Sequence, residues 1–113
     1  MKVKESDWKQ YRSLVPVVRD RYLAKKNEAF ARMLENTRKN PTELFWDTRE
    51  AIIEEGKLLS RVMGYEARSK MYVNLEGMCR IGMIEARDLE GFSQELVARM
   101  QPILDRFAES VET

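Results

Sequence analysis

The chain has 113 residues, of which 43% are hydrophobic and 35% charged, with a net charge of +1 at pH 7 and no histidine. This is the length of one domain, and few Gly and Pro among many Glu, Lys, Arg, Leu and Met are typical of an all-α protein. The absence of histidine removes the commonest general base and metal ligand, and a single cysteine excludes an intrachain disulfide and an ordinary zinc site.

The first predicted helix covers residues 7–38, with Ser6 or Asp7 as its cap. Pro16 lacks a backbone donor and clashes with the preceding turn, so we predict a kink there rather than a helix that ends near Leu14. Apolar side chains recur at spacings of three and four and mark one buried stripe: Trp8, Tyr11, Val15, Val18 and Tyr22.

The second predicted helix covers residues 41–63 and has the clearest start signal in the chain. Asn40 suits the N-cap, Pro41 the first helical position and Glu43 the capping box. Gly64 is expected to end the helix in a left-handed conformation. Three apolar side chains seven residues apart are predicted to face the core: Phe45, Ile52 and Leu59.

Two further helices are predicted over residues 66–81 and 86–110, with Gly82 ending the first of them in a left-handed conformation and Pro102 bending or splitting the second. The turn and the start of the fourth helix have the length of a DNA-reading helix-turn-helix. The exposed positions after the turn carry Arg87 against Glu90 and Glu95, which would repel a polyanion. We therefore interpret the turn as a corner of an all-α, four-helix bundle-like single domain, residues 1–113, with short loops.

Chemistry-bearing residues are sparse, and we predict no catalytic residue, no cofactor site and no metal site. Asp47, Glu50 and Glu54 share a helix face and could in principle hold a cation, but Lys57 nearby favours a solvent face with ion pairs. Cys79 is expected to be a small buried apolar group. The sequence thus indicates a protein that is not an enzyme, and an enzyme that uses only carboxylates and Lys or Tyr is the third alternative.

Charge is unevenly distributed along the chain. Residues 1–40 hold 11 Lys/Arg against 5 Asp/Glu, and residues 41–113 hold 9 against 14. Such asymmetry can indicate nucleic-acid contact, or halves that pack against each other or against another copy. A small nucleic-acid-binding regulator is therefore an alternative function, with four candidate contacts on the first helix: Arg12, Arg19, Lys25 and Lys26.

Large aromatic side chains are numerous for a small bundle. Leu44, Phe45 and Trp46 are consecutive and cannot all face one narrow core, so another chain could cover part of them. Trp and Tyr are favoured anchors of protein interfaces. We predict a protein-interaction or regulatory protein, self-associating as a homodimer through five residues: Trp8, Tyr11, Tyr22, Phe45 and Trp46.

The expected location is the cytoplasm. No apolar run approaches the ~20 residues that span a bilayer, and the first ten residues, MKVKESDWKQ, lack the apolar segment of a signal peptide. The sequence therefore predicts no membrane association.

Overall fold

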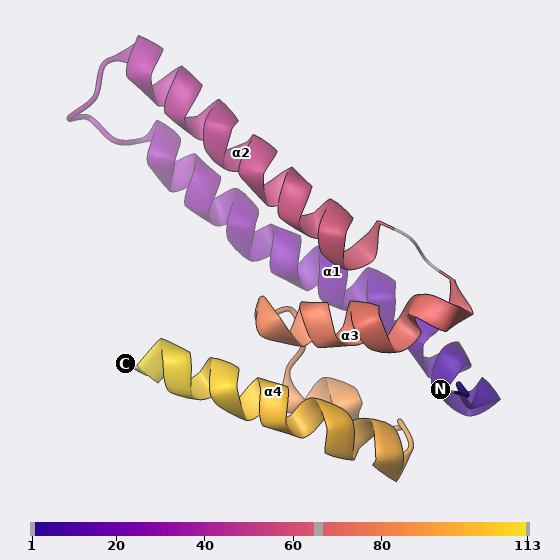
Figure 1. The fold of residues 1–113 in the computed structure, drawn as a ribbon. Helices are drawn as coiled ribbons and strands as arrows, with labels where there is room; N and C mark the ends of the chain where they lie inside the picture. The colour runs from indigo at the N-terminus through magenta and orange to yellow at the C-terminus, as the bar shows by residue number, and fades with distance from the viewer. Residues whose placement is uncertain (1, 65–66, 113) are drawn as a thin grey trace.

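The computed structural model describes residues 2–64 and 67–112, and over these ranges it contains helices and no strand, which confirms the predicted all-α fold class (Figure 1). Its four α-helices are joined by loops that include two short 3-10 helices. The elements in chain order are α1 (Glu5–Leu34), α2 (Pro41–Met63), η1 (Arg68–Lys70), α3 (Met71–Arg80), η2 (Ala86–Leu89) and α4 (Gln94–Glu112).

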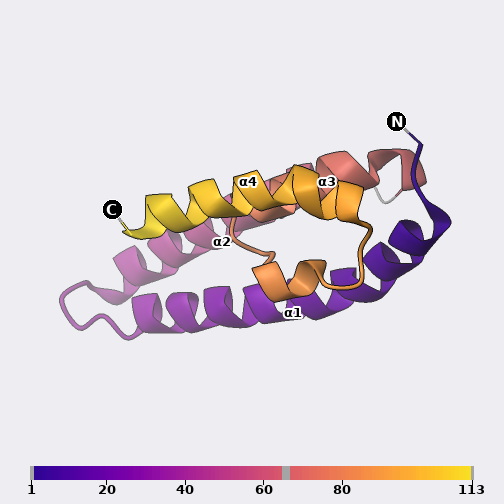
Figure 2. The ribbon, with the colours of Figure 1, turned by 90° about the horizontal axis from the view of Figure 1, so that it is seen from below.

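The helices are arranged as two pairs of unequal length, of which α1 and α2 are antiparallel, whereas α3 and α4 run in the same direction. α1 and α2 form a long hairpin, and α3 and α4 pack together against one end of it (Figures 1 and 2). The other end of the hairpin projects beyond this body, and the molecule measures 53 × 31 × 19 Å along its principal axes. The bundle-like fold is therefore complete at only one end.

α1 begins and ends earlier than the predicted range 7–38. The helix starts at Glu5, and Asp7 does not cap it because its carboxylate is buried against Ser93 at the start of α4. The chain leaves the helix after Leu34, where the side chain of Asn36 accepts the Arg38 backbone N–H, a local bond that competes with helix formation. α1 continues through Pro16 and bends toward its N-terminus in Figure 2.

α2 has the predicted bounds and the predicted start. The Asn40 side chain accepts the Glu43 backbone N–H at 2.9 Å and donates to the Glu43 carboxylate at 2.7 Å. The end of α2 differs from the prediction, because Gly64 has a right-handed conformation with φ −70°. Its amide is bonded to the Ser60 carbonyl, so the last turn of α2 needs no left-handed residue.

The segment between α3 and α4 corrects the predicted fourth helix, residues 86–110. Glu85 and Asp88 form a capping box, but only the 3-10 turn η2 follows it. Gly91, with φ +94°, turns the chain again, and α4 starts at Gln94 after Ser93. The predicted left-handed Gly82 is confirmed, with φ +81°. A recognition helix is therefore not formed after this turn.

The third helix also differs from its predicted range, residues 66–81. Within the described residues, η1 comes first and α3 covers only Met71–Arg80, while the predicted start at Glu66 lies outside the described residues. Cys79 of α3 is completely buried, as predicted. Burial raises the pKa of its thiol to about 12, so it is protonated and unreactive at neutral pH.

The hydrophobic core lies where all four helices meet. α1 contributes Tyr11, Val15, Val18 and Tyr22, and beyond Tyr22 no residue of α1 is buried. The other buried apolar side chains come from the end of α2, from α3 and from the chain that follows it: Val62, Met71, Leu75, Met78, Cys79, Met83, Ile84, Leu89, Phe92, Leu96, Met100 and Leu104. The half of the hairpin beyond Tyr22 therefore consists of α1 and α2 alone, without a second layer of helices packed on it.

Candidate protein-interaction surface

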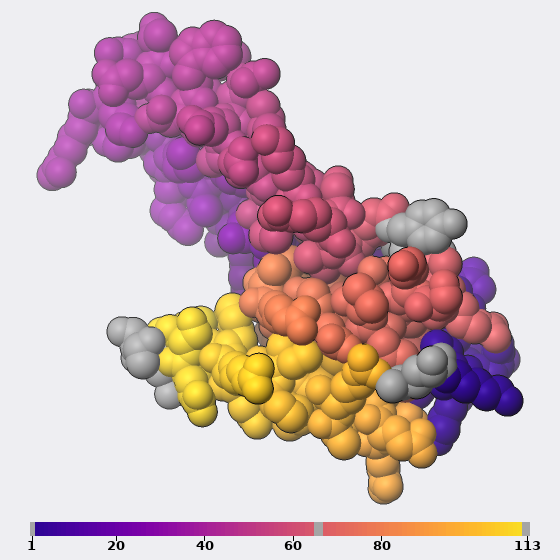
Figure 3. All heavy atoms as spheres, viewed as in Figure 1, coloured from indigo at the N-terminus to yellow at the C-terminus, as the bar shows by residue number. Residues whose placement is uncertain are grey.

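The projecting end of the hairpin exposes large apolar side chains. Exposed fractions are 53% for Leu34, 58% for Phe45, 56% for Trp46, 49% for Ile52 and 37% for Ile53. Together with Arg49 they are here called the hairpin-end face. The space-filling view shows that the body formed by α3 and α4 does not extend over this arm of the molecule (Figure 3).

The hairpin-end face contains a groove between the end of α1 and the start of α2. Its volume is about 430 Å³, and it is lined by Leu34, Phe45, Thr48, Arg49, Ile52 and Ile53. The Thr48 hydroxyl is buried and has no hydrogen-bond partner among the described residues. An apolar groove with few polar groups is the usual character of a site that receives an apolar side chain or helix.

Aromatic and cationic contacts order the rim of the groove. Phe45 and Trp46 meet edge to face, with ring centroids 5.0 Å apart and an interplanar angle of 87°. The Arg49 guanidinium lies 5.6 Å from the centroid of the Trp46 ring. These contacts restrict the side-chain rotamers before any partner binds, which lowers the entropic cost of association.

The prediction that Phe45 and Ile52 face the core is wrong. α2 contacts α1 through a neighbouring stripe that includes buried Thr48, and no other helix reaches its outer face at this end. Leu34, Ile52 and Ile53 were therefore absent from the predicted interface. The sequence did contain a signal for this surface, namely two pairs of adjacent apolar residues, Phe45-Trp46 and Ile52-Ile53. Adjacent residues lie 100° apart around a helix, so together they form a wider apolar surface than a single buried stripe.

The other predicted interface residues lie elsewhere on α1. Tyr11 and Tyr22 are buried in the core of the chain itself. Trp8 stacks on Tyr11 with centroids 5.7 Å apart and is covered further by Arg12 and Arg68. The structure therefore brings Phe45 and Trp46 together on one surface, and places Trp8, Tyr11 and Tyr22 apart from them.

Tyr22 belongs to a polar cluster that joins α1 to α2. Its hydroxyl donates a hydrogen bond to Glu55, and Lys26 lies 3.7 Å from the same carboxylate and 5.3 Å from the Tyr22 ring. Burial, and then the bond to Glu55, raise the pKa of Tyr22. The phenol is therefore neutral at physiological pH and acts as a fixed donor.

The four predicted nucleic-acid contacts do not share one surface. Arg12 and Arg19 line a groove of about 480 Å³ along α1, together with Trp8, Tyr11, Val15 and Pro16. Lys26 is paired with Glu55, on the hairpin. Lys25 lines a different pocket of about 460 Å³, between α1 and the end of α4. Only Arg12 and Arg19 therefore lie together.

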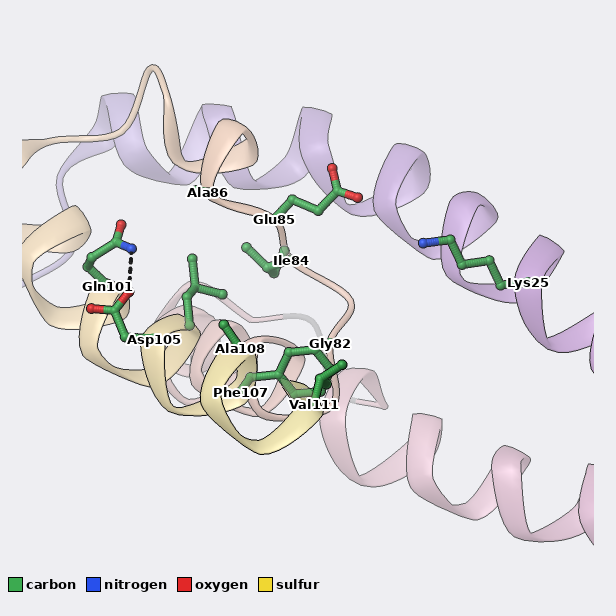
Figure 4. A pocket seen from close by; sticks show the side chains of 11 residues that line it. Lys25, Gly82, Ile84, Glu85, Ala86, Gln101, Asp105, Phe107, Ala108 and Val111 are labelled. Carbon is green, nitrogen blue, oxygen red and sulfur yellow. Dashed lines mark hydrogen bonds between the residues drawn. The ribbon is translucent and has the colours of Figure 1, made fainter. Parts of the chain in front are cut away.

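The pocket at Lys25 has walls of mixed character (Figure 4). Phe107, Ala108 and Val111 of α4 supply an apolar side, while Glu85 and Asp105 supply carboxylates. Asp105 accepts a hydrogen bond of 3.0 Å from Gln101. Because Lys25 faces acidic side chains here, this pocket does not extend the positive surface of Arg12 and Arg19.

The acidic face of α2 is occupied by ion pairs. Asp47 binds Lys39 at 2.5 Å, and Glu54 binds Lys57 at 3.2 Å. Within residues 2–64 and 67–112, no cluster of three or more Cys, Asp or Glu side chains has the arrangement needed to hold a metal ion. None of the helices in these ranges combines the length and apolarity that a membrane span requires.

Over the described residues, fold and surface together define a helical structure with an exposed apolar face at the end of a hairpin. Comparisons with protein-family models, with curated proteins and with solved structures find no match. The functional argument therefore starts from the geometry of this face.

Proposed function

We propose that the chain is a non-enzymatic protein-interaction module of regulatory character that self-associates through the hairpin-end face. The supporting observation is a continuous group of five exposed large apolar side chains on the half of the hairpin that lacks a second layer. Exposed apolar patches of this kind mark protein interaction sites. The proposal places the protein in the cytoplasm, where its single cysteine would stay reduced.

The energetics favour a dimer that depends on concentration. Covering a half-exposed Phe, Trp, Leu or Ile side chain gains about 1 kcal/mol. In a two-fold interface each contact occurs twice, so the five side chains contribute roughly 10 kcal/mol. This gain is of the same order as the ~4–15 kcal/mol cost of bringing two molecules together. We therefore expect monomer and dimer to be in equilibrium.

Replacement of Phe45 by Asp should abolish self-association. The new carboxylate would be buried in the interface without a partner, which costs several kcal/mol in each copy. Sedimentation equilibrium of the wild type and of Phe45→Asp over a wide concentration range measures this effect. The wild type should show a monomer–dimer equilibrium, and the variant should remain monomeric.

Val73→Asp is the matched control for this experiment. Val73 is 63% exposed on α3, away from the hairpin-end face, so the same substitution there should leave the dissociation constant unchanged within about twofold. A wild type that stays monomeric at all concentrations would contradict the proposed self-association. Equal weakening by both variants would contradict the choice of surface.

Nucleic-acid binding is the second candidate function, supported by the groove that Arg12 and Arg19 line. Neither arginine is paired with a carboxylate among the described residues. Anisotropy of labelled duplex DNA and single-stranded RNA at increasing salt tests it. Binding through these groups should fall steeply with salt, and the double substitution of Arg12 and Arg19 by Ala should reduce the slope by about two.

A further inference from the structure

Resting on the proposed self-association, we infer that the second copy of the chain binds antiparallel, α2 against α2, about a two-fold axis beside Arg49 and Glu50. A closed dimer of identical chains uses the same surface on both copies, so the hairpin-end face must be complementary to itself. Three features favour the antiparallel orientation of the two α2 helices: the order of charges along α2, the size of the side chains that meet, and the position of α3 and α4 on the hairpin.

The order of charges along α2 favours the antiparallel orientation. Glu43, Asp47, Glu50 and Glu54 lie in its first two thirds, and Lys57 and Arg61 follow in its last turns. A parallel pair would place these groups against identical ones. An antiparallel pair centred near Glu50 brings exposed Glu43 opposite exposed Lys57 of the second copy, at both ends of the contact.

One register satisfies both the apolar and the charged positions. With the axis beside Glu50, Trp46 lies opposite Ile53 of the second copy, and Arg49 lies opposite Glu50 of the second copy. A shift by one helical turn in either direction would place the Glu50 carboxylate against Phe45 or against Ile53. Such a shift would bury a charge against an apolar side chain, which is unfavourable.

Gly56 supplies a small residue where this register brings a large one. Glycine inside a helix is less stable than alanine by about 1 kcal/mol, and a Cβ at Gly56 would meet nothing within 4 Å in the chain. Packing within the chain therefore gives no reason for glycine at this position. In the antiparallel register Phe45 of the second copy lies two residues, about 3 Å along the helix, from the position level with Gly56. The missing side chain at Gly56 lets this ring lean toward the backbone.

The placement of the body is compatible with this arrangement. α3 packs on the last turns of α2 (Figure 1), while Ser60 and Arg61 on these turns stay exposed. In an antiparallel dimer the two bodies formed by α3 and α4 lie at opposite ends. The tip of each hairpin can then pass beside the exposed turns of the other α2 without meeting the other body.

Gly56→Ala separates the stability of the chain from its self-association. Because the added methyl group meets nothing within the chain and removes glycine's conformational entropy, the monomer should gain thermal stability. The same methyl group should obstruct Phe45 of the second copy and raise the dimer dissociation constant at least fivefold. A dimer unaffected by Gly56→Ala would contradict the proposed register.

Engineered cysteines test the orientation directly. A disulfide requires Cα atoms within about 7 Å. Arg49→Cys lies at the axis and should cross-link to itself. Thr42→Cys should not, because the two copies of residue 42 would lie roughly 22 Å apart along the helices, at 1.5 Å per residue. A mixture of Thr42→Cys and Lys57→Cys should cross-link between the two variants, and each alone should remain reduced.

The native Cys79 is buried and does not interfere, and Val73→Cys, exposed on α3, measures random collision. Dimers in which Thr42→Cys or Lys57→Cys cross-links to itself would overturn the antiparallel orientation while leaving self-association intact. A protein that sedimentation shows to be monomeric would overturn the proposed function and this inference together. We expect disulfide-linked dimers from Arg49→Cys alone and from the mixture of Thr42→Cys with Lys57→Cys. Every other sample should cross-link no more than Val73→Cys does.

Discussion

Substitution of Asp7 by Ala should lower the free energy of unfolding by about 2–4 kcal/mol, although Asp7 is far from the hairpin-end face. The side chain is completely buried, and its two oxygens accept the Ser93 backbone N–H at 2.8 Å and the Ser93 hydroxyl at 2.6 Å. Alanine would leave both donors of the half-buried Ser93 without this acceptor, and a buried group that loses its partner costs about 1–3 kcal/mol. Urea denaturation followed by circular dichroism measures the loss.

The carboxylate of Asp7 also lies at the N-terminus of α4, where the helix dipole favours negative charge. Asp7→Asn retains the shape and one acceptor, so its loss should be smaller than that of Asp7→Ala. Asp20→Ala is the matched control, since Asp20 is exposed on the same helix, and it should change the stability by less than about 0.5 kcal/mol. Equal losses for Asp7→Ala and Asp20→Ala would show that the contact with Ser93 contributes nothing.

Substitution of Asp88 by Asn should lower stability at neutral pH by about 2–3 kcal/mol and reduce its dependence on pH. Arg21 donates to both Asp88 oxygens, at 3.2 and 2.5 Å, and to the Met83 carbonyl at 2.9 Å. The Glu85 backbone N–H adds a further bond of 2.7 Å to Asp88. These contacts tie α1 to η2, and loss of the carboxylate would leave the half-buried guanidinium with only the more distant Glu85, at 3.8 Å, as a counter-ion.

The sign of the pH dependence follows from the pKa of Asp88. Burial acts to raise this pKa, but the hydrogen bonds from Arg21 and Glu85 outweigh it and hold the pKa below its ordinary value. The contribution to stability is therefore complete above the unfolded-state pKa, near 3.9, and is lost as the pH falls through the lower folded-state pKa. The gap in unfolding free energy between wild type and Asp88→Asn should be widest at pH 6–7 and narrow below about pH 4.

Urea denaturation of both proteins between about pH 2 and pH 7 measures this gap. Asp20 is exposed and makes no such contacts among the described residues, so Asp20→Asn should change the stability by less than about 0.5 kcal/mol. A constant gap for Asp88→Asn would mean that its carboxylate titrates alike in the folded and unfolded chain.

Local sequence was sufficient for much of the helical structure. The Asn40-Pro41-Thr42-Glu43 segment specified the start of α2, because its capping bonds form between residues three apart. Apolar spacing identified the stripe of α1 that is buried from Tyr11 to Tyr22. The start of α4 was placed wrongly because the capping box at Glu85 is a real local signal, but Gly91 ends the turn that it starts.

The candidate surface could be predicted only in part. Adjacent Phe45 and Trp46 showed that one helix carries more apolar surface than a single stripe can bury. Whether the surplus is covered depends on how far α3 and α4 reach along the hairpin, and no local signal reports that distance. Tyr11 and Tyr22 show the same limit of sequence-based prediction. Tyrosine is a residue type favoured at interfaces, but both of these side chains are buried, because α3 and α4 cover this part of α1.

By itself, the sequence determined the helical class, the start and length of α2, and the absence of histidine and disulfide chemistry. These properties depend on composition or on residues within one or two helical turns. Only the tertiary structure decided that Asp7 reaches Ser93, 86 residues away, and that the second layer ends before Phe45 and Ile52. Such contacts depend on the packing of whole helices, because an apolar stripe has the same periodicity whether or not another helix covers it.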